Sequence, residues 1–233
     1  MRALFVTGIG TGIGKTIVSA ILTEALYAGY WKPIQAGHAG GTDSEWIRDH
    51  ISNPYSKIFP ETYRLIMAAS PHIAAREEGT RISLERIVND FNKITTSQSG
   101  AGKELMSPSK RSEKSDWLIV EGAGGLLVPL NEKEFVSDLA IKLQSEIVLV
   151  SRNYLGSINH SLLTSAHCRN LGLSVLGWVF NDQYLDYEAE LAAWSGIRRI
   201  ASIPFSYQPD REFIKAQADL IREPLYQILG QAV

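Results

Sequence analysis

The chain has 233 residues, of which 45% are hydrophobic and 21% charged, a composition typical of a globular protein with one substantial core. Its 23 lysines and arginines nearly balance 25 aspartates and glutamates, which argues against general electrostatic attraction to nucleic acid or to an anionic membrane. The single cysteine, Cys168, excludes an internal disulfide and favours a reducing, cytoplasmic location. We therefore expect small-molecule partners, with no nucleic acid and no membrane.

Six short apolar runs, each bounded by turn residues, are predicted to be strands. In chain order they are ALFVT (3–7), YWKPI (30–34), WLIVE (117–121), EIVLVS (146–151), VLGWVFN (175–181) and IASIP (200–204). Because the runs are mostly apolar rather than alternating, we expect strands that are buried on both faces. Glycines interrupt the first run long before it could form a membrane-spanning helix.

Helical spacing of apolar residues separates these runs. It is clearest at 18–25 and at 158–166, and the second segment is followed by Gly172, a typical helix stop. Alternating strands and helices predict an α/β fold, a mostly parallel sheet with helices on both faces, in a single domain over residues 1–233. In such a sheet ligands bind at the carboxyl ends of the strands.

The stretch TSQSGAGKELMSPSKRSEKS, residues 96–115, departs from this rhythm. It is rich in serine, lysine and glycine and has little to bury, so we expect a flexible surface insertion. Its GAGKE fragment looks like part of a phosphate-binding loop. However, Glu104 replaces the hydroxyl residue that such a loop needs and no predicted strand precedes it, so we interpret the fragment as a chance match.

The first glycine-rich stretch, TGIGTGIGKT at residues 7–16, nearly matches the phosphate-loop pattern G-x-x-x-x-G-K-[ST], which would require glycine where this chain has Ile9. It follows a predicted strand and opens a predicted helix, so its backbone N–H groups are expected to bind nucleotide phosphates in a P-loop NTPase-like fold. Lys15 would neutralise the β- and γ-phosphates, and Thr16 would place its hydroxyl on Mg²⁺. A glycine-rich turn that merely connects strand and helix is the less favoured alternative.

The run DWLIVEGAGG places an acidic residue, Glu121, at the end of a predicted buried strand. A carboxylate there would face the phosphate loop and hold Mg²⁺ directly or through water. An acid after an apolar run is otherwise often a helix cap or a solvated strand end. The pairing with the phosphate loop favours the metal role.

The segment YWKPIQAGHAGGTDSE, residues 30–45, carries two further candidates. Lys32 lies in or at the end of a short strand, where a charge is costly unless it meets an anion or emerges into a cleft. Asp43 follows in a glycine-rich loop. From the residues alone, an edge-strand lysine and a solvated aspartate explain the pattern equally well.

The chain resembles the dethiobiotin synthetase family of biotin biosynthesis. The family's phosphate loop carries one extra residue before G-K-T, as GIGTGIGKT does here. Other family motifs occur in the same order over most of the chain: KPIQAG (32–37), SPHIAA (70–75), EGAGG (121–125), GSINHSLLT (156–164), WVFND (178–182) and SIP (202–204).

The resemblance implies conversion of 7,8-diaminononanoate, CO₂ and ATP into dethiobiotin, ADP and phosphate. One amine and CO₂ form a carbamate, which attacks the γ-phosphate to give a carbamic-phosphoric anhydride, and the other amine closes the ureido ring. The resemblance assigns Lys32 to catalysis beside Lys15, which chiefly holds the nucleotide. We expect Thr11, late in the lengthened loop, to face the γ-phosphate and the carbamate.

The resemblance also implies the remaining site residues. The Mg²⁺ ligands would be Thr16, Asp43 and Glu121, a hard oxygen set suited to that ion rather than to zinc. The substrate would contact Ala36 and Ser70, and Ser157 and Asn159 from the other subunit of a homodimer. The ATP contacts would be Gly12, Ile13, Gly14, Lys15, Thr16, Ile17, Asp43, Glu121, Gly122, Ala123, Gly124, Asn181, Asp182, Pro204, Phe205, Ser206 and Asp210.

Two positions within these motifs carry a qualification. Ala36 stands where the family often has serine or threonine, so a hydroxyl contact to the substrate is missing. Asn159 could instead serve as a helix N-cap, which is the interpretation that the residues alone would favour.

Two rival functions share parts of the pattern. Partition and septum-positioning ATPases resemble the chain in fold, but their signature lysine early in the loop is replaced here by Gly10. Related ATP-dependent amidating enzymes normally carry a glutaminase domain with a reactive cysteine, whereas Cys168 lies in a helical pattern, SAHCRN, that predicts packing.

Overall fold

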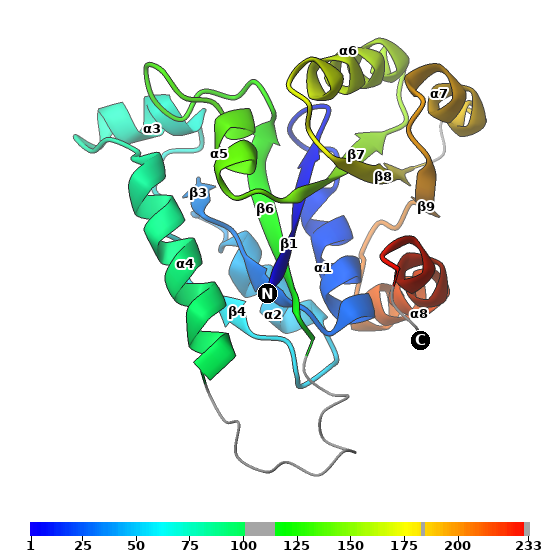
Figure 1. The fold of residues 1–233 in the computed structure, drawn as a ribbon, viewed down its shortest axis with the longest axis horizontal. Coiled ribbons are helices and arrows are strands. Elements are labelled where there is room, and N and C mark those ends of the chain that lie inside the picture. Colours follow the sequence, from blue (N-terminus) through cyan, green and yellow to red (C-terminus); the bar gives the residue numbers. More distant parts are fainter. Residues whose placement is uncertain (101–114, 183–184, 231–233) are drawn as a thin grey trace.

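Seven parallel strands form the main sheet of the computed structural model, which describes residues 1–100, 115–182 and 185–230 (Figure 1). The spatial order is β4-β2-β6-β1-β7-β8-β9, and each neighbouring pair is parallel. This arrangement confirms the predicted parallel sheet. The strands are β1 (Arg2–Gly8), β2 (Gly29–Trp31), β4 (Ile58–Phe59), β6 (Trp117–Gly125), β7 (Glu146–Arg152), β8 (Val175–Asn181) and β9 (Arg199–Ile203).

Eight helices in the described residues cover the two faces of this sheet, which confirms the prediction of helices on both sides (Figure 1). One core cluster joins the sheet to α1, α2 and α8, and a second joins its other face to α3 through α7. The helices are α1 (Lys15–Leu26), α2 (Asp43–His50), α3 (Pro71–Glu77), α4 (Leu84–Gly100), α5 (Val136–Lys142), α6 (Ser157–Asn170), α7 (Glu188–Ser195) and α8 (Arg211–Ile228).

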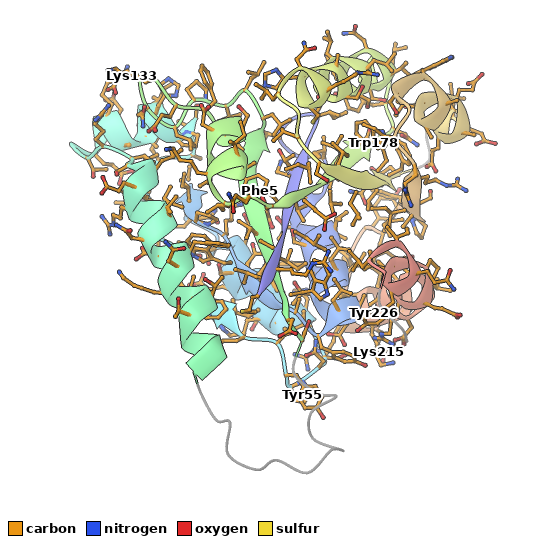
Figure 2. All side chains as sticks on the ribbon, viewed as in Figure 1. Phe5, Tyr55, Lys133, Trp178, Lys215 and Tyr226 are labelled. Carbon is orange, nitrogen blue, oxygen red and sulfur yellow. The ribbon has the colours of Figure 1, made fainter. Side chains whose placement is uncertain are left out.

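Alternation along β1 distributes its side chains between the two clusters. Leu4 and Val6 belong to the cluster with α1, whereas Phe5 belongs to the opposite one. Figure 2 shows Phe5 and Trp178 in the interior and Lys215 on the periphery. Because both faces are buried, the strands have no solvated face, which explains their near-continuous apolar sequence.

The predicted strand at 30–34 is wrong in one respect, because the structure divides it in two. β2 ends at Trp31, and β3 (Ile34–Ala36) pairs with β5 (Tyr63–Leu65) in a separate two-stranded parallel sheet. Pro33 has no N–H to donate to a ladder, and proline restricts the backbone of the residue before it. Lys32 therefore lies at the break, where its side chain can leave the sheet.

The predicted surface insertion at 96–115 begins inside a helix, because α4 continues to Gly100. Residues 101–114 of this stretch lie outside the described residues. Within the described ranges, no helix combines the length and the apolar character needed to cross a membrane.

Candidate functional site

The loop between β1 and α1, residues 9–14, leaves the start of α1 open to an anion. Gly14 is the N-cap with a φ of 87°, no side chain caps the helix, and its first turn contains no acidic residue. The free N–H groups and the helix dipole therefore favour negative charge at this end. A Cβ at Gly14 would lie 2.4 Å from Asn181 Nδ2, so only glycine lets the loop pass this close to β8.

Four side chains that were predicted from three separate motifs meet beside this loop. Thr16 Oγ1 lies 3.1 Å from Asp43 Oδ1 and 3.0 Å from Glu121 Oε1. Lys32 Nζ donates to Asp43 Oδ2 and lies 3.2 Å from Glu121 Oε1. The arrangement is a hydroxyl and an ammonium group held between two carboxylates.

Glu121 reaches this cluster because it points from β6 toward the loop. β6 pairs with β1 and continues to Gly125, so Glu121 lies within the strand rather than at its end as predicted. Alternation sends Gly122 to the opposite face, where a Cβ would lie 2.9 Å from the ring of Phe5. Gly122 thus serves packing, while Ala123 lines the same cavity as Glu121.

Asp43 is the first residue of α2, not part of an irregular loop as predicted. Thr42 and Glu45 form a capping box around it: each side chain accepts from the other residue's backbone N–H. Gln35 Oε1 accepts from Asp43 N at 3.3 Å, and Gln35 Nε2 donates to the Gly37 carbonyl. These contacts fix the start of α2 beside the cavity.

The pKa values of the two lysines shift in opposite directions, although burial lowers both. Burial lowers the pKa of Lys15 to about 8, partly offset by Glu121, and its Nζ donates to the Gly10 carbonyl at 2.7 Å. Burial acts in the same direction on Lys32, but the negative charges of Glu121 and Asp43 outweigh it and raise the pKa of Lys32. Lys32 is therefore a charged group held by its partners.

A cavity of 700 Å³ opens beside the cluster. It brings together residues from the loop, β3, α2 and β6, with Ala36 and Ser70 in its wall. Gln35, which the sequence analysis did not identify, lines it too. The predicted residues that it collects are Thr11, Gly12, Gly14, Lys15, Thr16, Ile17, Lys32, Ala36, Asp43, Ser70, Glu121, Ala123 and Gly124.

A smaller cavity of 130 Å³ lies on the other side of the loop, between the ends of β8 and β9. Asn181 Nδ2 donates to the Ile13 carbonyl at 2.7 Å, which ties β8 to the loop. The cavity also collects the predicted residues Gly12, Ile13, Gly14, Ile17, Asn181, Asp182, Pro204, Phe205 and Ser206.

Two acidic residues near this smaller cavity have structural partners. Asp182 has a φ of 56° and pairs with Arg152 Nε at 2.5 Å. Asp210 does not line the cavity, and its carboxylate caps α8 by accepting from Phe213 N at 2.8 Å. A helix cap is thus the observed role of Asp210.

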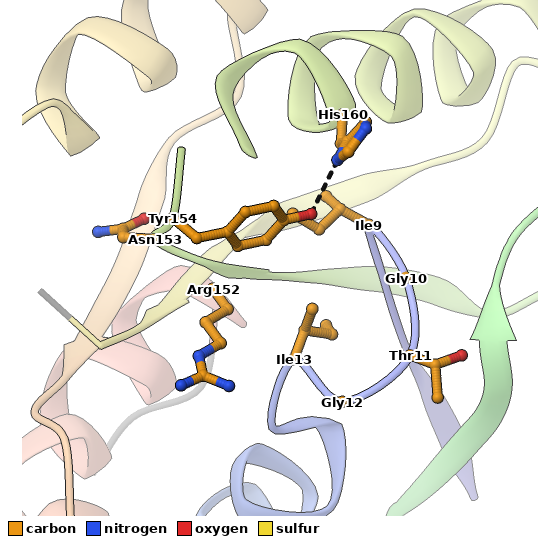
Figure 3. A pocket seen from close by; sticks show the side chains of 9 residues that line it. All are labelled: Ile9, Gly10, Thr11, Gly12, Ile13, Arg152, Asn153, Tyr154 and His160. Carbon is orange, nitrogen blue, oxygen red and sulfur yellow. Dashed lines mark hydrogen bonds between the residues drawn. The ribbon is translucent and has the colours of Figure 1, made fainter. Parts of the chain in front are cut away.

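A third cavity, of 630 Å³, lies between the loop, the end of β7 and the first turn of α6 (Figure 3). Arg152, Asn153, Tyr154 and His160 line it, and Tyr154 OH lies 2.8 Å from His160 Nδ1. These four residues were not among the site residues expected from the sequence. For residues 152–154 the available signal was a run of polar side chains at the carboxyl end of a predicted strand, whereas His160 lies in α6.

The two residues predicted to contact substrate in a neighbouring subunit both lie at the start of α6 but differ in exposure. Ser157 is buried, and its Oγ lies 2.6 Å from Tyr187 OH. Asn159 is exposed. The interpretation of Asn159 as an N-cap is wrong, because Gly156 is the N-cap and Asn159 lies in the first turn.

The chemistry of the cluster fits Mg²⁺. Thr16, Asp43 and Glu121 offer one hydroxyl and two carboxylates, hard oxygen donors for an ion that usually keeps several waters and binds through few protein ligands. Across the part of the chain that the structure describes, no group of three histidine, cysteine, aspartate or glutamate side chains gathers as a metal site. The oxygen set beside a phosphate-binding loop can therefore hold a magnesium–nucleotide complex.

Solved structures and a family profile agree with the fold. A profile described as an AAA domain matches residues 2–212. The MinD cell division protein of Aquifex aeolicus is 13% identical, with a TM-score of 0.55 over 100% of this chain and 99% of that one. A ParA family ATPase from Chlorobium tepidum TLS is 12% identical, with a TM-score of 0.53 over 99% of this chain and 94% of that one. At such low identity these structures show the fold alone.

Curated relatives are much more similar in sequence. Proteins named ATP-dependent dethiobiotin synthetase BioD include that of Cytophaga hutchinsonii, 46% identical over 78% of this chain and 77% of the relative. Those of Novosphingobium aromaticivorans and Christiangramia forsetii are 40% and 37% identical, over 91% and 97% of this chain and 92% and 99% of the relatives. At this similarity over nearly its whole length, the chain belongs to the ATP-dependent dethiobiotin synthetase family, which are ligases.

Proposed function

We propose that this protein closes the ureido ring of dethiobiotin from 7,8-diaminononanoate and CO₂ in biotin biosynthesis, using ATP and releasing ADP and phosphate. The proposal rests on the cluster formed by four side chains beside the phosphate loop, where the N-terminus of α1 has no side-chain cap. These side chains are Thr16, Lys32, Asp43 and Glu121. Family membership supports the proposal. The phosphoryl acceptor on this proposal is a carbamate rather than water.

The proposed reaction has three steps. One amine of the substrate adds to CO₂ and loses a proton, which gives a carbamate. A carbamate oxygen then bonds to the γ-phosphorus as the bond from that phosphorus to ADP breaks. The second amine attacks the carbonyl carbon of the resulting anhydride, the carbon–oxygen bond to phosphate breaks, and loss of a proton completes the ring.

The two lysines would stabilise negative charge on different groups in this reaction. Lys15 starts α1 and has its ammonium over the loop, so it holds the β- and γ-phosphates. Lys32 lines the same cavity, where it stabilises the carbamate and the migrating phosphoryl group. Positioning and electrostatic stabilisation dominate phosphoryl transfer, and one preorganised contact of this kind contributes roughly 3 to 4 kcal/mol in the transition state. Thr11 also lines this cavity.

Thr16, Asp43 and Glu121 would hold Mg²⁺, which when bound neutralises charge that develops on the β- and γ-phosphates. The residues of the smaller cavity would receive the base. Because Asn181 Nδ2 is engaged by the Ile13 carbonyl, Asn181 Oδ1 is the atom left to accept from an exocyclic amine.

We also propose a homodimer in which the first turn of α6 meets the substrate of the second copy. Asn159 is exposed there and can contact the substrate carboxylate. The Ser157 hydroxyl is held inside its own subunit by Tyr187, so Ser157 would act by orienting this turn. Ala36 and Ser70 line the cavity that would hold the diamine.

Phosphate release from ATP and Mg²⁺ tests the function, measured with and without 7,8-diaminononanoate plus bicarbonate. We expect turnover only when both are present, with dethiobiotin detected by mass spectrometry. Turnover that ignores the diamine but responds to DNA, lipid or a partner protein would instead indicate a switch of the partition ATPase type.

A further inference from the structure

A buried tyrosine hydroxyl holds the far oxygen of Glu121. Tyr30 OH donates to Glu121 Oε2 at 3.0 Å. We propose that Tyr30 is a positioning residue for the metal-binding carboxylate of Glu121, and this inference rests on the proposed function. Tyr30 would thereby set the affinity of the protein for Mg²⁺ with nucleotide.

The two oxygens of Glu121 have different partners. Oε1 faces the cavity side, where Thr16 and Lys32 contact it, whereas Oε2 accepts from Tyr30. A carboxylate that is 1% exposed cannot obtain its hydrogen bonds from bulk water. The tyrosine thus prevents the carboxylate from rotating its second oxygen away and leaves Oε1 directed at the site.

The placement of Tyr30 is rigid because β2 fixes its backbone and the core fixes its ring. Tyr30 is paired with Ile119 on β6, two residues before Glu121 on the same strand. Its side chain is fully buried in the core cluster that contains α1. A residue on the neighbouring strand therefore reaches the carboxylate without a flexible link, which is the arrangement that holds metal ligands in a fixed orientation.

The segment that carries Tyr30 also carries Lys32, which contacts both carboxylates, and Gln35, which accepts from Asp43 N. Both metal-binding carboxylates are thus oriented from residues 30–35. Of these three residues, Tyr30 alone is absent from the cavity lining and its hydroxyl is fully buried, so its effect on a ligand must pass through Glu121.

Magnesium titrations of nucleotide binding test this role without relying on turnover. The probe is a fluorescent, non-hydrolysable ATP analogue, bound with and without Mg²⁺ to the wild-type protein, to Tyr30→Phe and to Tyr63→Phe. Tyr63 is the matched control, a buried tyrosine whose OH accepts from Ser83 N at 2.9 Å and does not line the cavity. We expect Tyr30→Phe to raise the Mg²⁺ concentration at half-saturation by about tenfold, because removing such outer contacts commonly weakens metal affinity 10- to 100-fold.

A double-mutant cycle separates positioning from a general effect on folding. In a Glu121→Gln background, Tyr30→Phe should have no further effect on the Mg²⁺ response, because the contact acts through the carboxylate. Metal-free affinity for the analogue and the melting temperature should change about equally little in Tyr30→Phe and Tyr63→Phe.

An unchanged Mg²⁺ response in Tyr30→Phe, or an equal shift in Tyr63→Phe, overturns the assignment of Tyr30 and leaves the proposed function intact. A wild-type protein whose nucleotide affinity ignores Mg²⁺ overturns the metal role of Glu121, and the assignment of Tyr30 with it.

Discussion

The side-chain amide of Asn181 donates to the carbonyl of Ile13 across 2.7 Å, joining the end of β8 to the phosphate loop. The two residues are far apart in the chain, and both line the smaller cavity. Gly14, the next loop residue, has room for no side chain because Asn181 occupies that space. The shape of the loop before ligand binds therefore depends on a residue that the sequence motif does not contain.

Asn181→Asp is expected to loosen the loop in the nucleotide-free protein. The substitution keeps the size of the side chain but replaces the donor with a carboxylate oxygen that repels the Ile13 carbonyl. Amide hydrogen exchange at residues 12–15, measured without nucleotide, should become at least about tenfold faster, equivalent to about 1.4 kcal/mol of local opening.

The matched control for that experiment is Asn131→Asp. Asn131 Nδ2 also donates to a backbone carbonyl, that of Ile82 at 3.0 Å, but does so away from the loop. Exchange at residues 12–15 should stay at the wild-type rate in this control. Equal rates in Asn181→Asp and the wild type would mean that the glycine loop holds its shape unaided.

Lys32→Ala is expected to reduce product formation severely while leaving nucleotide binding largely intact. Lys32 contacts the two carboxylates rather than the loop, and Mg²⁺ in the assay compensates their charge when the ammonium group is removed. Loss of one preorganised charge should lower kcat by about 100-fold or more. The measurements are dethiobiotin formation and the Kd of an ATP analogue.

Lys142→Ala, on the exposed side of α5, serves as the matched control for charge and should retain wild-type activity. If nucleotide affinity falls as steeply as kcat in Lys32→Ala, Lys32 is a nucleotide clamp and its assigned role in catalysis is wrong.

The central strands and the phosphate loop could be predicted because their signals are local. An apolar run followed by glycines and a lysine needs no knowledge of distant residues. The contact from Tyr30 to Glu121 spans 91 positions, and no periodicity indicates which buried hydroxyl will meet which carboxylate. Pro33 interrupts the 30–34 run, but the sequence does not show that the residues after it form a separate strand, because β3 depends on pairing with the distant strand β5.

The capping roles show the same limit. The resemblance implies a nucleotide contact for Asp210, whereas the structure shows it capping α8, a role that depends on where that helix begins. Likewise, Gly156 rather than Asn159 is the N-cap of α6, because the helix begins a few residues earlier than the N-cap interpretation of Asn159 requires. Element boundaries thus determine which polar side chains remain free for ligands.

Glu24→Gln is expected to destabilise the fold at neutral pH but not in acid. Burial alone would raise the pKa of Glu24, but hydrogen bonds from Ser52 and Asn53 outweigh it and lower that pKa below 4.5. A lowered pKa in the folded state adds stability above the unfolded pKa, and this stability is lost as the pH falls through the folded pKa. Urea unfolding should show a loss of about 2 kcal/mol at pH 7.

The difference between Glu24→Gln and the wild type should shrink as the pH is lowered through 4. Glu223→Gln, at an exposed position on α8, should match the wild type throughout. A difference that is constant with pH would mean that the charge of Glu24 contributes nothing.

Cys168 is expected to be inert in the native protein. Burial raises the pKa of its thiol to about 11, and the side chain is enclosed in the core cluster on the α6 face. At pH 8 about one thiol in a thousand is ionised. Iodoacetamide should therefore label Cys168 only slowly until urea unfolds the chain, as followed by mass spectrometry. Rapid native labelling that stops turnover would instead support the reactive cysteine of an amidating enzyme.

The two cavities on either side of the loop draw on different parts of the chain. The larger one is built from residues 11–128, and the smaller one, beyond the loop and α1, from residues 152–213. On the proposed function, the choice of base and the choice of phosphoryl acceptor would therefore be encoded in separate, consecutive segments that share the glycine loop. Substitutions in the C-terminal segment would then alter which nucleoside triphosphate is accepted without changing the phosphoryl acceptor. Substitutions in the N-terminal segment would alter the acceptor without changing the nucleotide.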